Sequence, residues 1–149
     1  MPGVRHVPVE PALLLDTAAE AGRAALARSV TNGLDAGDDV LVEIVMGEEP
    51  DLGIGPRLAE ALAETLAPAV HHTSGLAATG GETAAALLAR FGVNGIRLAD
   101  EIEPGVSLGL TLGSVSLPVV TKAGAFGDRG SLTRITERLR SIRQKGVLA

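Results

Sequence analysis

The chain has 149 residues, a net charge of −5 and no cysteine, and 46% of its residues are hydrophobic. That apolar content is sufficient for the core of one folded domain, and the lack of cysteine excludes disulfides, thiolate catalysis and cysteine-ligated metals. Aromatic residues are only 1% of the chain. Together with the negative charge this argues against nucleic-acid binding, which needs stacking platforms and cations for the phosphates.

The N-terminal segment has no apolar run of the signal-peptide type, and no stretch approaches the roughly 20 apolar residues that span a bilayer. We therefore expect a cytoplasmic protein with no membrane partner. Six of the 13 basic residues lie in residues 129–149. This charge bias favours the solvated face of a last helix, and an anion site is the alternative.

In chain order, the sequence predicts alternating strands and helices. Val7 and Val9 indicate a short first strand that ends at Pro11. The spacing of Thr17 and Glu20 matches a capping box and predicts that a helix opens there. Leu26, Val30 and Leu34 recur every four residues along this helix, which Gly33 and Gly37 are expected to end.

The second quarter of the chain repeats this order. The β-branched run of residues 40–45 predicts a strand covered on both faces. Pro56 suits the first position of a helix whose apolar stripe is Leu58, Leu62 and Leu66. A strand of small residues follows at 75–79, and Gly80-Gly81 ends it where the next helix begins.

The second half predicts a more mixed arrangement. Asn94-Gly95 has the sequence of a tight turn, and residues 96–98 and 106–108 alternate like half-buried strands. A last strand is expected at 117–121 and a final helix after it, with Leu132, Ile135, Leu139 and Ile142 on one side. The predicted fold is α/β, a three-layer α/β/α sandwich with a mixed, mostly parallel sheet.

The clearest local motif is the segment Gly80, Gly81, Glu82 and Thr83, between a strand and a helix. Two glycines allow the backbone to turn sharply and to approach a ligand closely. The free N–H groups of the following helix and its dipole then favour an anion, and Thr83 adds a hydroxyl. A plain strand-to-helix turn capped by Thr83 explains the same residues equally well.

A second motif follows the last strand, at Lys122, Ala123, Gly124, Phe126 and Gly127. Ligands of open α/β sheets lie beside such strand ends, where an ammonium could meet a phosphate. The simpler interpretation is a solvated lysine, with Phe126 filling the core. On the residues alone the simpler interpretation is slightly favoured.

Other motifs are weaker. No Walker A sequence and no Ser/His/Asp arrangement is present, so the sequence names no catalytic residue. His71-His72 is interpreted as an exposed pair and not as a metal site. The acids Asp100, Glu101 and Glu103 precede Pro104-Gly105, and they are interpreted as exposed turn acids and not as Mg²⁺ ligands.

Four blocks in order resemble a known family: residues 75–84, 95–98, 101–106 and 117–128. They are similar to the C-terminal nucleotide-binding domain of the four-carbon acid sugar kinases, which act on threonate, erythronate or 3-oxo-tetronate. The resemblance extends over residues 7–149, although the first third matches by pattern more than by motif. It identifies residues 7–149 as a nucleotide-binding domain.

The resemblance implies an ATP or ADP site, with Mg²⁺ expected from the chemistry. Gly80, Gly81, Glu82 and Thr83 match the family's phosphate-side loop. Its second nucleotide-side loop is matched by Lys122, Ala123, Gly124, Phe126 and Gly127. Ala125 departs from the family, which usually has glycine there.

The family also has an N-terminal domain that binds the sugar acid and supplies the catalytic base, and the chain is expected to lack it. The expected partner is therefore that domain, in cis or in trans, and a homodimer is a further expected assembly. The resulting prediction is the ATP-binding half of an acid sugar kinase, inactive alone. The alternatives are a non-catalytic nucleotide-sensing or interaction module and a small-molecule enzyme active by itself.

Overall fold

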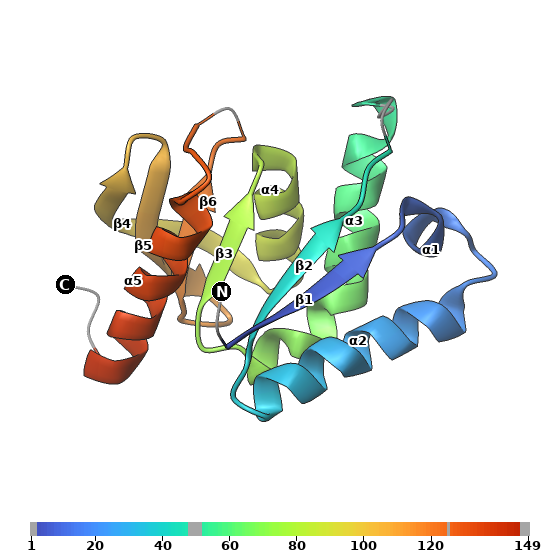
Figure 1. Cartoon of the computed structure of the whole chain (residues 1–149), viewed down its shortest axis with the longest axis horizontal. Helices are drawn as coiled ribbons and strands as arrows, with labels where there is room; N and C mark the ends of the chain where they lie inside the picture. The colour runs from blue at the N-terminus through green and yellow to red at the C-terminus, as the bar shows by residue number, and fades with distance from the viewer. Residues whose placement is uncertain (1–2, 48–51, 125, 147–149) are drawn as a thin grey trace. The chain divides into compact units, whose positions relative to one another are not determined.

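A computed structural model of the chain describes residues 3–47, 52–124 and 126–146. The chain divides into two compact units, Met1–Thr73 and Ser74–Ala149. Each unit combines helices with a small sheet of its own (Figure 1). No helix in the described part of the chain is long and apolar enough to cross a bilayer.

The first unit is built on two parallel strands joined through helices. Strand β1 (Val4–Val9) pairs with β2 (Asp39–Ile44) in parallel, so the connection between them crosses over. The remaining elements of this unit are α1 (Pro11–Leu15), α2 (Glu20–Asp35), the 3₁₀ segment η1 (Leu52–Ile54), α3 (Gly55–Leu66) and the 3₁₀ segment η2 (Ala67–His72).

The core of this unit uses the stripes that the sequence predicts. On α3, Leu58, Leu62 and Leu66 are all buried, and Pro56 lies in the first turn. Leu26 and Val30 are buried on α2, which packs against α3, β2 and η2. The four-residue spacing therefore identified the inward faces of both helices.

The predicted opening of α2 at a capping box is wrong. The helix begins at Glu20 with Ala19 as its N-cap, and no side chain caps it. A carboxylate oxygen of Asp16 accepts the N–H of Ala18 at 2.9 Å, so Thr17 lies in the turn that follows α1. The expected helix end at Gly33 is also wrong, since α2 continues to Asp35 and a Cβ on Gly33 would lie 3.0 Å from Val40.

The second unit carries a four-stranded sheet in the order β3-β6-β5-β4. Strands β3 and β6 are parallel, and β5 is antiparallel to both of its neighbours. Its elements are β3 (Leu76–Thr79), α4 (Gly81–Arg90), β4 (Val93–Glu103), β5 (Val106–Gly113), β6 (Pro118–Lys122) and α5 (Ser131–Lys145).

The two helices of this unit cover opposite faces of the sheet. Val120 packs with Ile135 and Ile142 of α5 in one buried cluster. Its neighbour Thr121 points the other way, since successive strand residues alternate, and lines a cavity together with Ala84 of α4. The second unit is therefore a three-layer α/β/α arrangement.

The predicted α/β class and the mixed sheet are confirmed. The six described strands fall into two sheets, and two of their four pairings are parallel. Parallel pairings therefore do not predominate, because the β4–β5 hairpin and its return to β6 are antiparallel.

The turn predicted at Asn94-Gly95 is wrong. Both residues lie inside β4, where the register with β5 shifts between Val93 and Gly95. The chain turns two residues before Asn94, at Gly92, which has φ +77°. Asn-Gly therefore marks an irregularity in the ladder here, a position that also favours glycine.

Candidate functional site

The candidate site is a cavity of about 390 Å³ in the second unit. It lies where β3 and β6, the two parallel neighbours, reach their carboxyl ends, which is the usual ligand position in open α/β sheets. Its lining residues are Gly80, Gly81, Ala84, Gly105, Ser107, Thr121, Lys122, Ala123 and Gly124.

The first wall is the junction between β3 and α4. Gly80 has φ +91° and ψ 133°, a conformation that residues with a side chain rarely adopt. Its N–H donates to the carbonyl of Lys122 at 2.9 Å, and its carbonyl accepts the N–H of Ala84 at 3.0 Å. Gly80 thus ends the strand ladder and starts the helix within one residue.

The first turn of α4 leaves its donors available. The N–H groups of Gly81, Glu82 and Thr83 have no acceptor within the helix, and no side chain caps this helix. A Cβ placed on Gly81 meets nothing within 4 Å, so the space beside it is open. This turn can receive an anion without rearrangement.

The second wall follows β6. Ala123 donates its N–H to the carbonyl of Gly105 at 3.1 Å, which joins this segment to the β4–β5 turn. A Cβ on Gly124 also meets nothing within 4 Å. Lys122, which is among the lining residues, donates an Nζ–H to the carbonyl of Ala123 at 3.3 Å.

The structure brings the two predicted motifs together. Gly80 and Gly81 of the first and Lys122, Ala123 and Gly124 of the second line one cavity. The remaining predicted residues lie next to it without lining it: Glu82, Thr83, Phe126 and Gly127. Ala125 is outside the described residues.

Phe126 and Gly127 support the second wall from behind. The expectation that Phe126 fills the core is wrong, because it is 51% exposed and its ring packs against Gly105. Gly127 has φ +90°, and a Cβ there would come 2.7 Å from Cε of Lys122. Glycine is thus required at both Gly105 and Gly127 by conformation and by space.

Sequence reasoning missed Ala84, Gly105, Ser107 and Thr121 as lining residues. Ser107 and Thr121 are directly opposite each other in the β5–β6 ladder. Each of them follows a fully buried valine, Val106 or Val120, so strand alternation would have placed both on the other face. The long-range pairing of β5 with β6 was the missing information.

Three of the other polar residues considered in the sequence, His72, Asp100 and Glu103, have partners in the structure. His72 Nδ1 lies 2.8 Å from Asp35, and Asp100 pairs with Arg138 at 3.1 Å. Glu103 is held by Arg134, which lowers the pKa of that carboxyl. Among the described residues, no group of three or more histidines and acids has the arrangement of a metal site.

A family model described as a nucleotide-binding C-terminal domain matches residues 2–132 of this chain. The chain belongs to this family of nucleotide-binding C-terminal domains. The match includes both glycine motifs and all of the residues that line the cavity.

Curated relatives carry the name D-threonate kinase. The chain is 44% identical over 133 residues to the one from Cupriavidus necator, covering 87% of this chain and 32% of that protein. It is 45% identical over 75 residues to the one from Bordetella bronchiseptica, covering 49% and 18%. The chain therefore spans about a third or less of the length of these relatives.

Solved structures agree on the fold. A domain of unknown function from Bordetella bronchiseptica, solved with bound citrate as a domain-swapped dimer, matches with a TM-score of 0.76 and 34% identity. That match covers 93% of this chain and 35% of the other. A Haemophilus influenzae protein matches with a TM-score of 0.67 at 18% identity, over 89% and 34% of the two chains, which shows a shared fold alone.

Proposed function

We propose that the cavity between the two glycine motifs binds the phosphates of ATP and ADP. We further propose that the chain is the nucleotide-binding part of a kinase for a four-carbon acid sugar of the threonate type. The observation that carries the proposal is the convergence of the two motifs on one cavity, with open space beside Gly81 and Gly124. The family match and the names of the curated relatives support it.

Each motif would contact the nucleotide in its own way. The first-turn N–H groups of Gly81, Glu82 and Thr83 would donate to phosphate oxygens, and the helix dipole adds to this attraction. Lys122 would contribute a cation, and the backbone around Ala123 and Gly124 would follow the nucleotide closely. Phe126 and Gly127 would hold that backbone in place.

Magnesium would enter with the nucleotide. The lining residues carry no carboxylate, so the described part of the chain offers the ion no acidic ligand within the cavity. Mg²⁺ commonly keeps several waters and binds through substrate phosphates, which suits such a site. Its chemistry would be to neutralise charge on the transferred phosphoryl group.

The acceptor and the base for phosphoryl transfer would come from a partner. No lining residue of the cavity is an acid or a histidine, the groups that most often accept the proton of a hydroxyl. We propose a sugar-acid-binding domain, in cis or in trans, in a cytoplasmic protein that can form a homodimer.

The same observation favours one alternative. A cavity with phosphate donors and no proton acceptor also fits a non-catalytic nucleotide-sensing module. The two functions differ in the partner, because only the kinase needs a second domain that presents a sugar acid.

Calorimetric titration of the chain with ADP and ATP, with and without Mg²⁺, tests the proposal. We expect binding with a Kd on the order of 0.1 mM. Mg²⁺ should strengthen the binding of ATP more than that of ADP, because ATP carries more charge to neutralise. Adenosine, which has no phosphate, is the matched control and should bind more weakly than either. Equal binding of adenosine and ADP, or no binding of any of them, would reject a phosphate site.

A further inference from the structure

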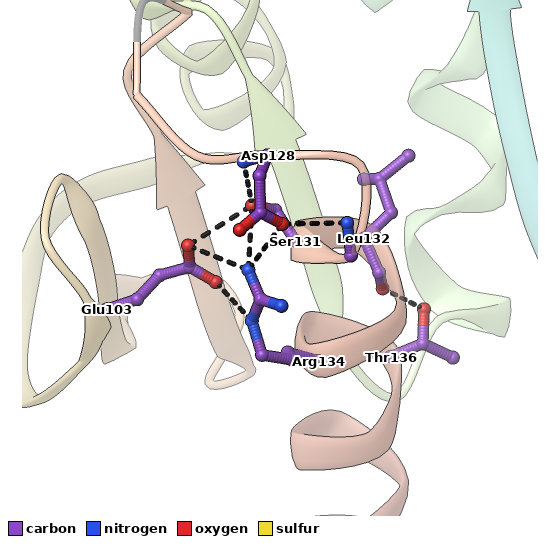
Figure 2. Close-up of polar contacts among 7 residues, drawn as sticks. Glu103, Asp128, Ser131, Leu132, Arg134 and Thr136 are labelled. Atoms are coloured by element: carbon purple, nitrogen blue, oxygen red, sulfur yellow. Dashed lines mark hydrogen bonds and ion pairs between the residues drawn. The ribbon is translucent and has the colours of Figure 1, made fainter.

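Four side chains lie close together beside the cavity, and none of them belongs to a lining residue. We name Glu103, Asp128, Ser131 and Arg134 the Arg134 cluster (Figure 2). Both carboxylate oxygens of Glu103 face the guanidinium, at 2.8 Å from Nε and 3.1 Å from Nη2 of Arg134. Asp128 accepts from the same Nη2 at 2.8 Å. One arginine thus joins the end of β4 to the segment before α5.

Ser131 completes the cluster from within. It is 1% exposed, its Oγ donates to Glu103 at 3.1 Å, and it accepts the N–H of Asp128 at 2.9 Å. Asp128 in turn accepts the N–H of Gly130 at 2.7 Å. The backbone from Asp128 to Ser131 is therefore held at two points, the N–H groups of Asp128 and Gly130, by side chains of the cluster.

The cluster is joined to the cavity by one packing contact and by one short stretch of chain. Gly127 packs between Ser131 and the side chain of Lys122, since a Cβ there would meet both. Glu103 lies two residues before Gly105, which lines the cavity and accepts the N–H of Ala123. Displacing the cluster would thus release Lys122 on one side and the Gly105–Ala123 bond on the other.

The charges of the cluster support a firm arrangement. Hydrogen bonds from Arg134 lower the pKa of Glu103 and that of Asp128 below their ordinary values. The side chain of Glu103 is 17% exposed and that of Arg134 is 43% exposed, so their paired, two-point contact is partly open to water and its strength comes from its geometry. A lysine at 134 could not make this contact, because an ammonium lacks the planar fork.

We propose that the Arg134 cluster positions Lys122 and the Ala123–Gly124 backbone for nucleotide binding, so that Arg134 and Glu103 are positioning residues of the site. This inference rests on the proposed nucleotide function. Neither side chain would touch the nucleotide.

The test compares Arg134→Ala with a matched control on the same two elements. Arg138 pairs with Asp100 at 3.1 Å and also joins α5 to β4, one helical turn away from the cluster. We expect Arg134→Ala to weaken ADP binding roughly three-fold to ten-fold, and Arg138→Ala to change it by less than about two-fold. Binding is measured as the ADP-induced rise in melting temperature, which remains measurable for weak complexes.

A double-mutant cycle with Lys122→Ala separates positioning from general loss of stability. If Arg134 acts by placing Lys122, the Arg134→Ala substitution should cost less ADP affinity when Lys122 is already absent. A merely structural role would give the same loss in both backgrounds. Glu103→Gln, a milder change that keeps the shape of the side chain, serves as the second variant if Arg134→Ala does not fold.

The outcomes distinguish the two proposals. If the wild-type chain shows no ADP-induced stabilisation, the proposed function fails and takes this inference with it. Where the wild type binds ADP, three results would overturn the positioning role and leave the proposed function standing. These are unchanged ADP affinity in Arg134→Ala and Glu103→Gln, an equal loss of affinity in Arg138→Ala, and additive effects in the cycle. Weaker binding that is specific to the cluster and non-additive with Lys122→Ala supports it.

Discussion

At the scale of single residues, the two glycines of the first motif do different things. The sequence shows two adjacent glycines and gives no reason to separate them. In the structure only Gly80 has a positive φ, of +91°, whereas Gly81 is the first residue of α4 with open space beside it. Gly80 is thus required by the backbone, and Gly81 leaves room beside the cavity.

This difference predicts opposite effects on stability. Gly80→Ala should lower the free energy of unfolding by about 1–3 kcal/mol, because alanine resists that backbone conformation. Gly81→Ala is the matched control and should be neutral or stabilising by up to about 1 kcal/mol, since it restricts only the unfolded chain. Urea denaturation of both variants measures the two values. Equal losses would show that the assigned backbone angles are wrong.

The carboxylates of the Arg134 cluster predict an acid-sensitive stability. Arg134 lowers the pKa of Glu103 and of Asp128 below their ordinary values of 4.5 and 3.8. A lowered native pKa stabilises the fold above the ordinary value, and this stabilisation is lost as the pH falls through the native value. Melting temperatures of wild type and Glu103→Gln should therefore differ at neutral pH and approach each other as the pH falls below the ordinary value of 4.5. Parallel curves from pH 3 to pH 7 would contradict this.

At the scale of elements, the sequence predicted the helices and strands better than it predicted the positions of the turns. Periodicity located the inward faces of α2 and α3, and the β-branched run located β2. It could not place the β4–β5 turn, because Asn94-Gly95 and Pro104-Gly105 both favour chain reversal. The pairing of β4 with β5 decides between them, and pairing is not encoded in any local window.

The apolar side of α5 shows the same limit. The stripe of Leu132, Ile135, Leu139 and Ile142 is continuous in the sequence, yet Ile135 is 2% exposed and Leu132 is 38% exposed. Ile135 packs with Val106, Leu108 and Val120 of the sheet, whereas Leu132 lies in the first turn of the helix, beside the Arg134 cluster.

We therefore expect unequal costs along this stripe. Ile135→Ala should lower the free energy of unfolding by about 2–4 kcal/mol, because it leaves a cavity in the buried cluster. Leu132→Ala should cost less than about 1 kcal/mol, since its side chain keeps partial contact with water. Chemical denaturation of the two variants gives the comparison, and a larger cost for Leu132→Ala would refute the assigned packing.

At the scale of the whole molecule, the cavity is lined by glycines, small and hydroxyl residues and one lysine, and none of its described lining residues is an acid or a histidine. Local sequence signals predicted five of the nine lining residues, because each of the two motifs is a continuous segment of the chain. The other four come from α4, β5, β6 and the β4–β5 turn, and only tertiary pairing brings them together.

This composition predicts that the 149-residue chain binds ATP without transferring its phosphoryl group to threonate or erythronate. Phosphoryl transfer depends on holding donor and acceptor in line within a partly dried site. A coupled assay for ADP release measures turnover, and addition of a sugar-acid-binding domain in trans is the complementary arm. Sugar-acid-dependent turnover by the chain alone would overturn this prediction.

The claim at the centre of this account is that the cavity beside Gly81 receives the phosphates of a nucleotide. Calorimetric titration of ADP into wild type and Gly81→Val tests it most directly. Gly81 has no positive φ, so valine adds no backbone strain of the left-handed kind, and its side chain enters the open space at the cavity. We predict a folded variant whose melting temperature stays close to that of wild type and whose ADP binding is abolished. A folded Gly81→Val variant that binds ADP as tightly as wild type would contradict the assignment of this cavity.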